Sequence, residues 1–147
     1  MKIDYTSFNL LSVVLAIWQL PQLFVAAIVM LFALVFARDK AFIPCRNGNL
    51  SVWELRLNLK RNAPFCFSLG PIIVTPFRVT DANLKHETGH SVQSLLLGPL
   101  YLIVVAVPSV ILVSIKRILH KDNDWYHSKY PENWADELAW KVANDAD

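Results

Sequence analysis

The chain has 147 residues, enough for one domain, and 54% of them are hydrophobic. The hydrophobic residues gather in two blocks, at about residues 8–36 and 94–115, and the rest has ordinary polar composition. Lys and Arg alternate with acidic residues and leave a net charge of +2, which excludes nucleic acid as a partner. This profile predicts an α+β membrane protein, a single membrane-embedded domain over residues 1–147.

The basic residues are unevenly distributed around the two blocks. Only Lys2 precedes the first block, eight basic residues lie between the blocks, and five follow the second. By the positive-inside bias, the middle segment and the C-terminal tail both face the cytoplasm. We therefore expect the protein at the inner (cytoplasmic) membrane, where the reducing side keeps Cys45 and Cys66 as packed thiols.

The first block, residues 8–36, is long enough to cross about 30 Å of hydrocarbon as an N-terminal transmembrane helix. A signal peptide is the alternative, but the block is too long and no small-residue cleavage site follows it. Gln19 and Gln22 are costly in lipid, so their amides are expected to face protein or water. A simple kink at Pro21 explains the same residues equally well.

Residues 41–76 are predicted to form a small antiparallel β meander. Polar and apolar residues alternate strictly over residues 54–60, which is the period of a half-buried strand. The Asn-Gly pair at 47–48 is a hairpin signal. Further turns are expected at 62–64 and at 70–71.

Two helices are predicted after the strands. The first covers residues 80–97, with Thr80 or Asp81 as its N-cap. The second covers residues 131–143 and has Pro131 at its first helical position.

The first of these helices carries an HExxH motif. His86 and His90 are four residues apart, so both side chains lie on one face of the helix and can share one zinc ion. Glu87 lies beside them, where it can act as a catalytic base toward a water molecule that zinc has acidified. The motif predicts a catalytic zinc site.

A third ligand is expected from the C-terminal helix. Glu132 and Asp136 are also four residues apart and share one face of that helix. Glu132 can complete the zinc site, and Asp136 can accept the second ring N–H of a ligand histidine. Alternatively, both acids simply suit the dipole at a helix N-terminus.

These motifs resemble a known family. HETGH at residues 86–90, followed by Glu132-x-x-Ala-Asp136, is similar to the gluzincin membrane peptidases of the CAAX-prenyl-protease and heat-shock membrane protease type. The resemblance implies that both histidines and Glu132 bind zinc, that Glu87 is the base, and that Asp136 supports a ligand. The longer pattern HETGHSVQS…LGPLY also resembles small bacterial membrane proteins that have no established activity.

The second hydrophobic block separates the histidines from Glu132. A straight helix over residues 94–118 would rise about 37 Å and carry Glu132 across the bilayer from the zinc. Pro99 and Pro108 interrupt the block, so residues 98–118 are predicted to form a re-entrant membrane hairpin. A kinked single span is the alternative.

The predicted function is a membrane-embedded zinc metallopeptidase that cleaves a peptide or protein substrate beside a lipid bilayer. His127, Tyr126 and Tyr130 are candidates for binding substrate or the oxyanion. A homo-oligomer or a membrane partner is a further expectation. One alternative function is a non-catalytic membrane scaffold or accessory subunit with a structural or vestigial HExxH. Another is a zinc hydrolase of lipid amides.

Overall fold

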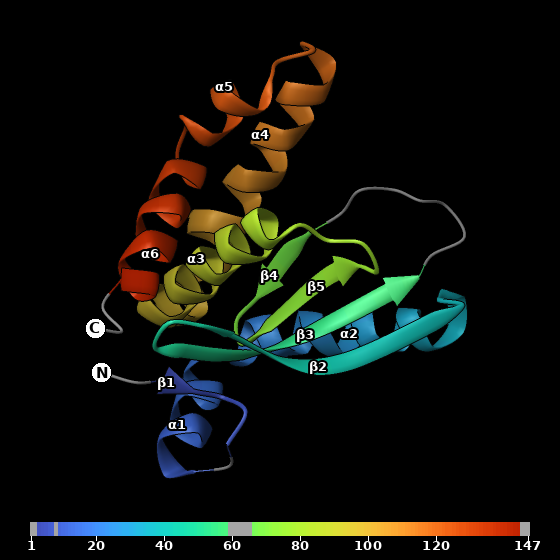
Figure 1. Ribbon diagram of the computed structural model, residues 1–147, viewed down its shortest axis with the longest axis vertical. Coiled ribbons are helices and arrows are strands. Elements are labelled where there is room, and N and C mark those ends of the chain that lie inside the picture. The colour runs from blue at the N-terminus through green and yellow to red at the C-terminus, as the bar shows by residue number, and fades with distance from the viewer. Residues whose placement is uncertain (1–2, 8, 59–65, 145–147) are drawn as a thin grey trace.

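The computed structural model describes residues 3–7, 9–58 and 66–144. Helices cover both faces of a five-stranded sheet (Figure 1). In chain order the elements are β1 (Ile3–Asp4), α1 (Leu10–Trp18), α2 (Leu20–Phe36), β2 (Asp39–Asn47), β3 (Leu50–Asn58), β4 (Phe67–Leu69), β5 (Ile72–Pro76), α3 (Asp81–Leu97), the 3-10 helix η1 (Gly98–Leu100), the π-helix η2 (Leu102–Ala106), α4 (Val107–Ile118), α5 (Asn123–His127) and α6 (Glu132–Asn144).

β3 is the central strand of the sheet. β2 pairs with it in antiparallel fashion, so the hairpin predicted at residues 47–48 is confirmed. β5 runs parallel to β3, and the short strand β4 pairs with β5 at the end of the order β1-β3-β5-β4. The antiparallel meander predicted over residues 41–76 is therefore wrong. The turn expected at 62–64 lies outside the described residues.

Burial explains the parallel pairing. Ile73 and Val74 of β5 are both buried although they point to opposite faces of the sheet. A meander would place β5 at the edge, whereas a strand that is apolar on both faces is most stable in the interior. The shorter strand β4 takes the edge position instead.

The two faces of the sheet contact different helices. On one face, Leu55 and Val74 pack against Ala33 of α2. On the other face, Val52 and Ile73 form a core with residues from α3 and α6. The sheet therefore lies between the middle of α2 and the part of α3 that packs on the opposite face.

The transmembrane helix predicted over residues 8–36 is wrong, because this segment forms two helices, α1 and α2, bent by 86°. Within the described ranges, no single helix is both long and apolar enough to cross a membrane. α1 and α2 reach the necessary length and apolar composition only when taken together, as a bent pair. Pro21 lacks the N–H that would continue the ladder, and its place at the start of α2 marks the break.

The two glutamines at this break face protein, as predicted. Gln19 accepts a hydrogen bond from the Tyr5 hydroxyl (3.0 Å) and donates to Oγ of Ser94 (3.2 Å). Gln22 donates to the carbonyl oxygen of Gly98. These contacts anchor the bend to the C-terminal end of α3.

The hairpin predicted over residues 98–118 is also wrong. η1, η2 and α4 follow one another with helical backbone angles at the junctions, so the chain does not turn back. The hairpin is predicted because Pro108 has no N–H to donate to the carbonyl of Val104, four residues earlier. The hydroxyl of Tyr130 donates to that carbonyl instead (2.8 Å), and the wider π-helical turn precedes the proline.

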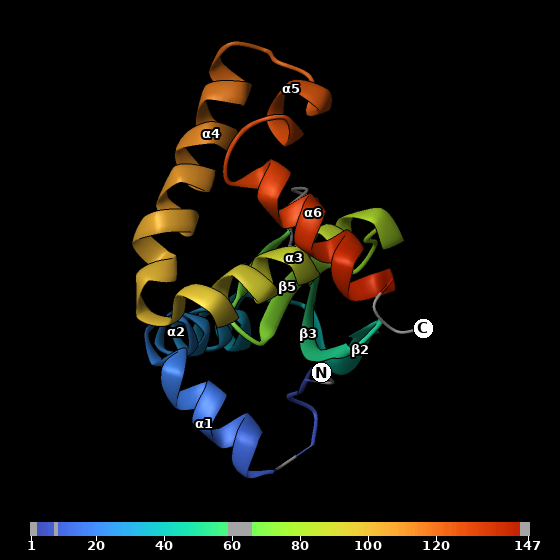
Figure 2. The same cartoon turned by 90° about the vertical axis from the view of Figure 1, so that its left-hand side faces the viewer.

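The chain reverses after α4 rather than within it. α5 packs against α4, and α6 then runs back along α3 (Figures 1 and 2). α6 begins at Glu132, so Pro131 precedes the helix and its carbonyl accepts the N–H of Ala135 (3.1 Å). This path returns Glu132 to the histidines without a membrane hairpin.

Candidate metal centre

α3 presents both motif histidines toward α6. The helix begins as predicted, with Oγ1 of Thr80 accepting the N–H of Asn83 (3.2 Å). Leu84 and Val92 pack toward the sheet core, while the ring centroids of His86 and His90 lie 4.8 Å apart. The prediction that the four-residue spacing places both imidazoles on one face of α3 is therefore confirmed.

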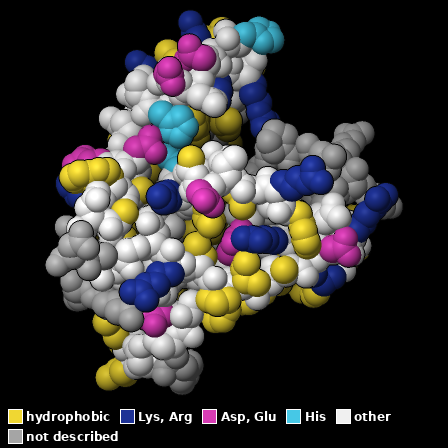
Figure 3. Space-filling model, viewed as in Figure 1, with side chains coloured by type: hydrophobic (Ala, Val, Ile, Leu, Met, Phe, Trp, Pro, Cys, Tyr) yellow, Lys and Arg dark blue, Asp and Glu magenta, His cyan; other side chains and the backbone are white. Residues whose placement is uncertain are grey.

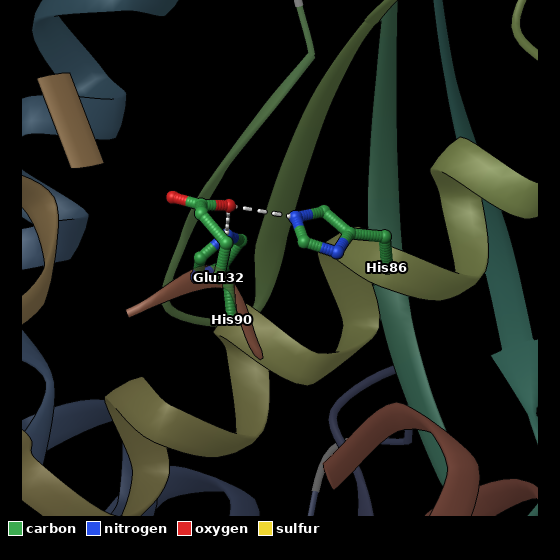
Figure 4. A group of neighbouring side chains, drawn as sticks. All are labelled: His86, His90 and Glu132. Carbon is green, nitrogen blue, oxygen red and sulfur yellow. Dashed lines mark hydrogen bonds and ion pairs between the residues drawn. The ribbon is translucent and has the colours of Figure 1, made fainter. Parts of the chain in front are cut away.

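α6 supplies the third group. Oε2 of Glu132 lies 3.0 Å from Nε2 of His86 and 3.2 Å from Nε2 of His90 (Figure 4). The carboxylate is completely buried, although 42 residues separate it from His90. The three residues predicted as metal ligands thus meet at a single point.

This geometry fits a zinc ion. Four ligands at 2.0–2.1 Å in a tetrahedron lie about 3.3 Å apart, close to the two distances measured here. Two imidazoles and one carboxylate are a common zinc set, whereas magnesium and calcium prefer oxygen ligands. Within the described part of the chain, no fourth His, Cys, Asp or Glu atom joins the group. Three protein ligands with one position left open are typical of catalytic zinc sites.

Each histidine is oriented through its other ring nitrogen. Nδ1 of His86 donates to Oδ1 of Asp136 (2.6 Å), and Nδ1 of His90 donates to Oε1 of Gln93 (2.7 Å). The amide of Gln93 is itself fixed, because its Nε2 donates to the carbonyl of Pro131 (3.0 Å). Since both acceptors hold Nδ1 protonated, both Nε2 atoms remain for a metal.

Glu87 is buried beside the histidines. Its side chain is 5% exposed, and its Oε2 has no hydrogen-bond partner among the described residues. Burial raises the pKa of Glu87, and the charges of His90 and His86 oppose this rise. A buried carboxylate oxygen without a partner is costly unless a ligand or water completes the site. This oxygen therefore fits a proton acceptor for a water molecule held at the metal.

The charges around His86 favour a cation. Burial lowers the pKa of His86, but its hydrogen bond to Glu132 and the carboxylates of Glu87 and Asp136 outweigh burial and raise that pKa to about 9. Burial likewise raises the pKa of Glu132, but hydrogen bonds with His86 and His90 hold it well below the usual range. A field that stabilises a protonated imidazole also stabilises a divalent ion at the same place.

The three candidate oxyanion residues have different surroundings. Nδ1 of His127 donates to Oδ2 of Asp136 (2.9 Å), so it contacts the residue that orients His86. The Tyr126 hydroxyl lies 3.4 Å from Oγ of Ser109 and close enough to Glu132 for the two to interact. The Tyr130 hydroxyl bonds the helix backbone, as described above. Of the three, Tyr126 has its hydroxyl beside Glu132, and His127 has its ring packed edge-on against His86, with the ring centroids 4.7 Å apart.

A second group of potential ligands shares one histidine with the first. His86, His127 and Asp136 offer atoms that lie within 4.8 Å of one another. Asp136 bridges the two rings, one carboxylate oxygen to each. Asp136 offers a different oxygen to each ring, whereas a single oxygen of Glu132 is shared by two rings. We therefore interpret this second group as a support that holds His86.

Two contacts at the site were not assigned from sequence. Oγ of Ser109 donates to Oε1 of Glu132 (2.5 Å) and leaves Oε2 to the histidines. In the sequence, Ser109 is a hydroxyl residue inside an apolar segment, and such a hydroxyl normally has a polar partner. This pattern indicates a contact of the kind seen with Glu132. Gln93 stands three residues after His90, on the same helical face, and this spacing predicts its contact with the ring.

No protein-family model matches this chain, and comparisons with curated proteins and with solved structures found no match. The likeness to gluzincin membrane peptidases stays a prediction. It depends on residues 86–90, Glu132 and Asp136.

Proposed function

We propose that this protein is a zinc metallopeptidase that binds one zinc ion through His86, His90 and Glu132. The observation that carries the proposal is the approach of one buried carboxylate oxygen to within 3.2 Å of both Nε2 atoms. Two imidazole nitrogens and one carboxylate oxygen at these separations match the spacing of three ligands around one zinc ion. The proposal is supported by this match and by the buried Glu87 beside it.

The ion, when bound, supplies a Lewis acid that lowers the pKa of a water molecule to about 7 and polarises a carbonyl group. Glu87 would accept a proton from a water molecule at this site as the water oxygen bonds to the peptide carbonyl carbon and the C=O π pair moves onto the carbonyl oxygen. Glu87 then passes the proton to the departing amide nitrogen as the C–N bond breaks. The products are a new carboxylic acid and a new amine, and transfer of the acid's remaining proton to the amine leaves a carboxylate and an ammonium group. A buried carboxyl with a raised pKa is suited to both transfers.

The rest of the chain orients these groups. Asp136 and Gln93 hold the two imidazole rings, and Ser109 holds the outer oxygen of Glu132. The open fourth ligand position favours an enzyme over a purely structural zinc site, which is closed by four protein ligands. A location on the cytoplasmic side and a peptide or protein as substrate stay predictions.

The test compares the wild type with Glu87→Gln. Both proteins are purified with zinc, their metal content is measured, and each is incubated with an unstructured protein whose new N-termini are detected by mass spectrometry. We expect one zinc ion in each and a loss of cleavage of at least about 100-fold in the variant. The matched control is Glu137→Gln, the same change at an exposed site on α6.

Two results would contradict the proposal. The first is a wild-type protein that does not retain zinc. The second is a Glu87→Gln variant that cleaves as fast as the wild type. If zinc is retained but neither protein cleaves anything, the scaffold alternative is supported.

A further inference from the structure

Four helical segments present apolar side chains to the outside of the molecule. α1, α2 (seen end-on) and the η2–α4 segment follow one another along one edge in Figure 2, and in Figure 1 α2 passes behind the sheet. We call the outward residues of α1, α2, η2 and α4 the apolar face. It contains some of the most exposed hydrophobic side chains, among them Leu10, Phe24, Leu31, Val35, Ile103 and Val110.

The pattern on α2 is the reverse of that on an ordinary surface helix. Its small or polar residues Gln22, Ala26 and Ala33 are buried against the rest of the protein. Phe24, at 69% exposure, and Val35, at 74%, point away from it. A surface helix normally places polar side chains outward. The outer side of α2 is therefore built for an apolar environment.

The apolar face has no charge of its own. No Asp, Glu, Lys or Arg occurs between residues 10 and 36 or between 91 and 115. A protein partner usually meets a surface with a polar rim and several hydrogen-bonding groups, whereas hydrocarbon chains require none. In contrast, charged side chains of both signs are spread over the face shown in Figure 3. The composition of the apolar face thus matches lipid.

Cations stand where this face ends. Arg38 follows α2 directly, Arg117 lies in the last turn of α4, and Lys121 follows that helix; all three are exposed. In Figure 2 the C-terminal end of α4 recedes from the edge formed by α2 and η1. The last turn of α4, which carries Arg117, therefore stands back from this edge, an arrangement that suits a cation at anionic headgroups when the edge is buried in acyl chains.

We propose that the apolar face docks into one leaflet of a lipid bilayer, with these cations at its phosphate groups. The helices lie against the membrane with their outer sides only, because α2 also packs along the sheet. Ser109 contacts Glu132 from the inner side of the η2–α4 segment. The metal centre then lies about 10 Å, one helix diameter, from the lipid. Docking does not require the metal, so it is independent of the proposed peptidase activity.

Flotation of the full chain with vesicles tests this proposal. The vesicles contain equimolar phosphatidylcholine and phosphatidylglycerol. We expect the wild type to float, and a Phe24→Asp, Leu31→Asp double variant to lose binding by at least about 10-fold, because an aspartate in hydrocarbon is strongly unfavourable. The matched control is Phe77→Asp with Trp140→Asp, two exposed hydrophobic residues outside the apolar face; it should float like the wild type.

A second measurement needs no variant. A photoactivatable acyl chain in the same vesicles should label peptides from α2 and η2 and leave α6 unlabelled. Labelling of α6 alone would contradict the proposal, as would a wild type that does not float. A wild type that stays in solution as a dimer, with the Asp variant monomeric, would assign the face to a second copy of the chain.

The headgroup contact has its own test. Arg38→Gln with Arg117→Gln should weaken binding to the anionic vesicles and leave binding to pure phosphatidylcholine unchanged. Equal binding of this variant and the wild type to the anionic vesicles would rule out the contact with phosphate.

Discussion

Gly89 and Ala135 bring α3 and α6, the two helices that carry the proposed ligands, into backbone contact. A Cβ atom on Gly89 would lie 1.9 Å from the carbonyl oxygen of Ala135 and 2.6 Å from its carbonyl carbon. Both atoms belong to the backbone of α6, so neither moves without the helix. Ala135 stands three residues after Glu132. The missing side chain at Gly89 therefore sets how closely the distant carboxylate approaches the histidines.

Gly89→Ala tests this relationship. Alanine is favoured over glycine in a helix by about 1 kcal/mol, but the clash pushes α6 away and should lower the free energy of unfolding by about 1–3 kcal/mol. Zinc binding should weaken as well, because Glu132 moves with α6. Urea unfolding and competition with a chromophoric chelator measure the two effects. Lys85→Ala, an exposed change on the same helix, is the control, and unchanged zinc affinity in Gly89→Ala would contradict the argument.

Glu132→Gln keeps the shape of the third ligand and removes its charge. Loss of a residue that merely supports a ligand weakens metal binding about 10–100-fold, so the loss of a ligand itself should exceed about 100-fold. Chelator competition gives the dissociation constant. Glu137→Gln on the solvent side of α6 should bind zinc like the wild type. If both variants bind equally well, Glu132 is not a ligand.

Asp136 and His127 form a chain of hydrogen bonds to His86, and their effects on zinc affinity should be coupled. Asp136→Asn should weaken zinc binding about 10–100-fold. His127→Ala should weaken it less, and in the double variant it should add little, because His127 acts through the carboxylate. The four dissociation constants form a double-mutant cycle. A His127→Ala variant with normal zinc affinity and a lower kcat would instead indicate direct contact with the substrate.

Tyr126 and Tyr130 should separate catalysis from stability. Tyr126→Phe removes a hydroxyl near Glu132 and should lower kcat by about 100–1,000-fold if that hydroxyl stabilises the oxyanion. Tyr130→Phe removes the hydrogen bond to the carbonyl of Val104 and should cost about 0.5–1.5 kcal/mol of stability. Its kcat should not change. Steady-state kinetics and urea unfolding of both variants provide the check, and the opposite pattern would exchange the two roles.

Several features of this protein follow from neighbouring residues alone. The spacing of His86 and His90, the cap at Thr80 and the turn at 47–48 are local patterns, and local backbone geometry decides them. The pairing of Glu132 with Asp136 belongs to the same class, because the helical period places both on one face. For this reason the candidate ligands on each helix could be chosen from sequence, whereas their meeting across 42 positions depends on the packing of α6 against α3.

Only the tertiary structure decided the course of the chain between these patterns. β5 lies parallel to β3 because two buried faces exclude it from the edge, and no residue near β5 encodes that neighbour. Residues 98–118 continue through consecutive helical turns past Pro108, and Tyr130, distant in sequence, donates to the Val104 carbonyl, to which Pro108 has no N–H to donate. The periodicity of a sequence shows which face of a helix or strand is apolar. It does not show which distant segment packs on that face, because this depends on close packing. At Gly89, the absence of a Cβ atom allows α6 to approach α3.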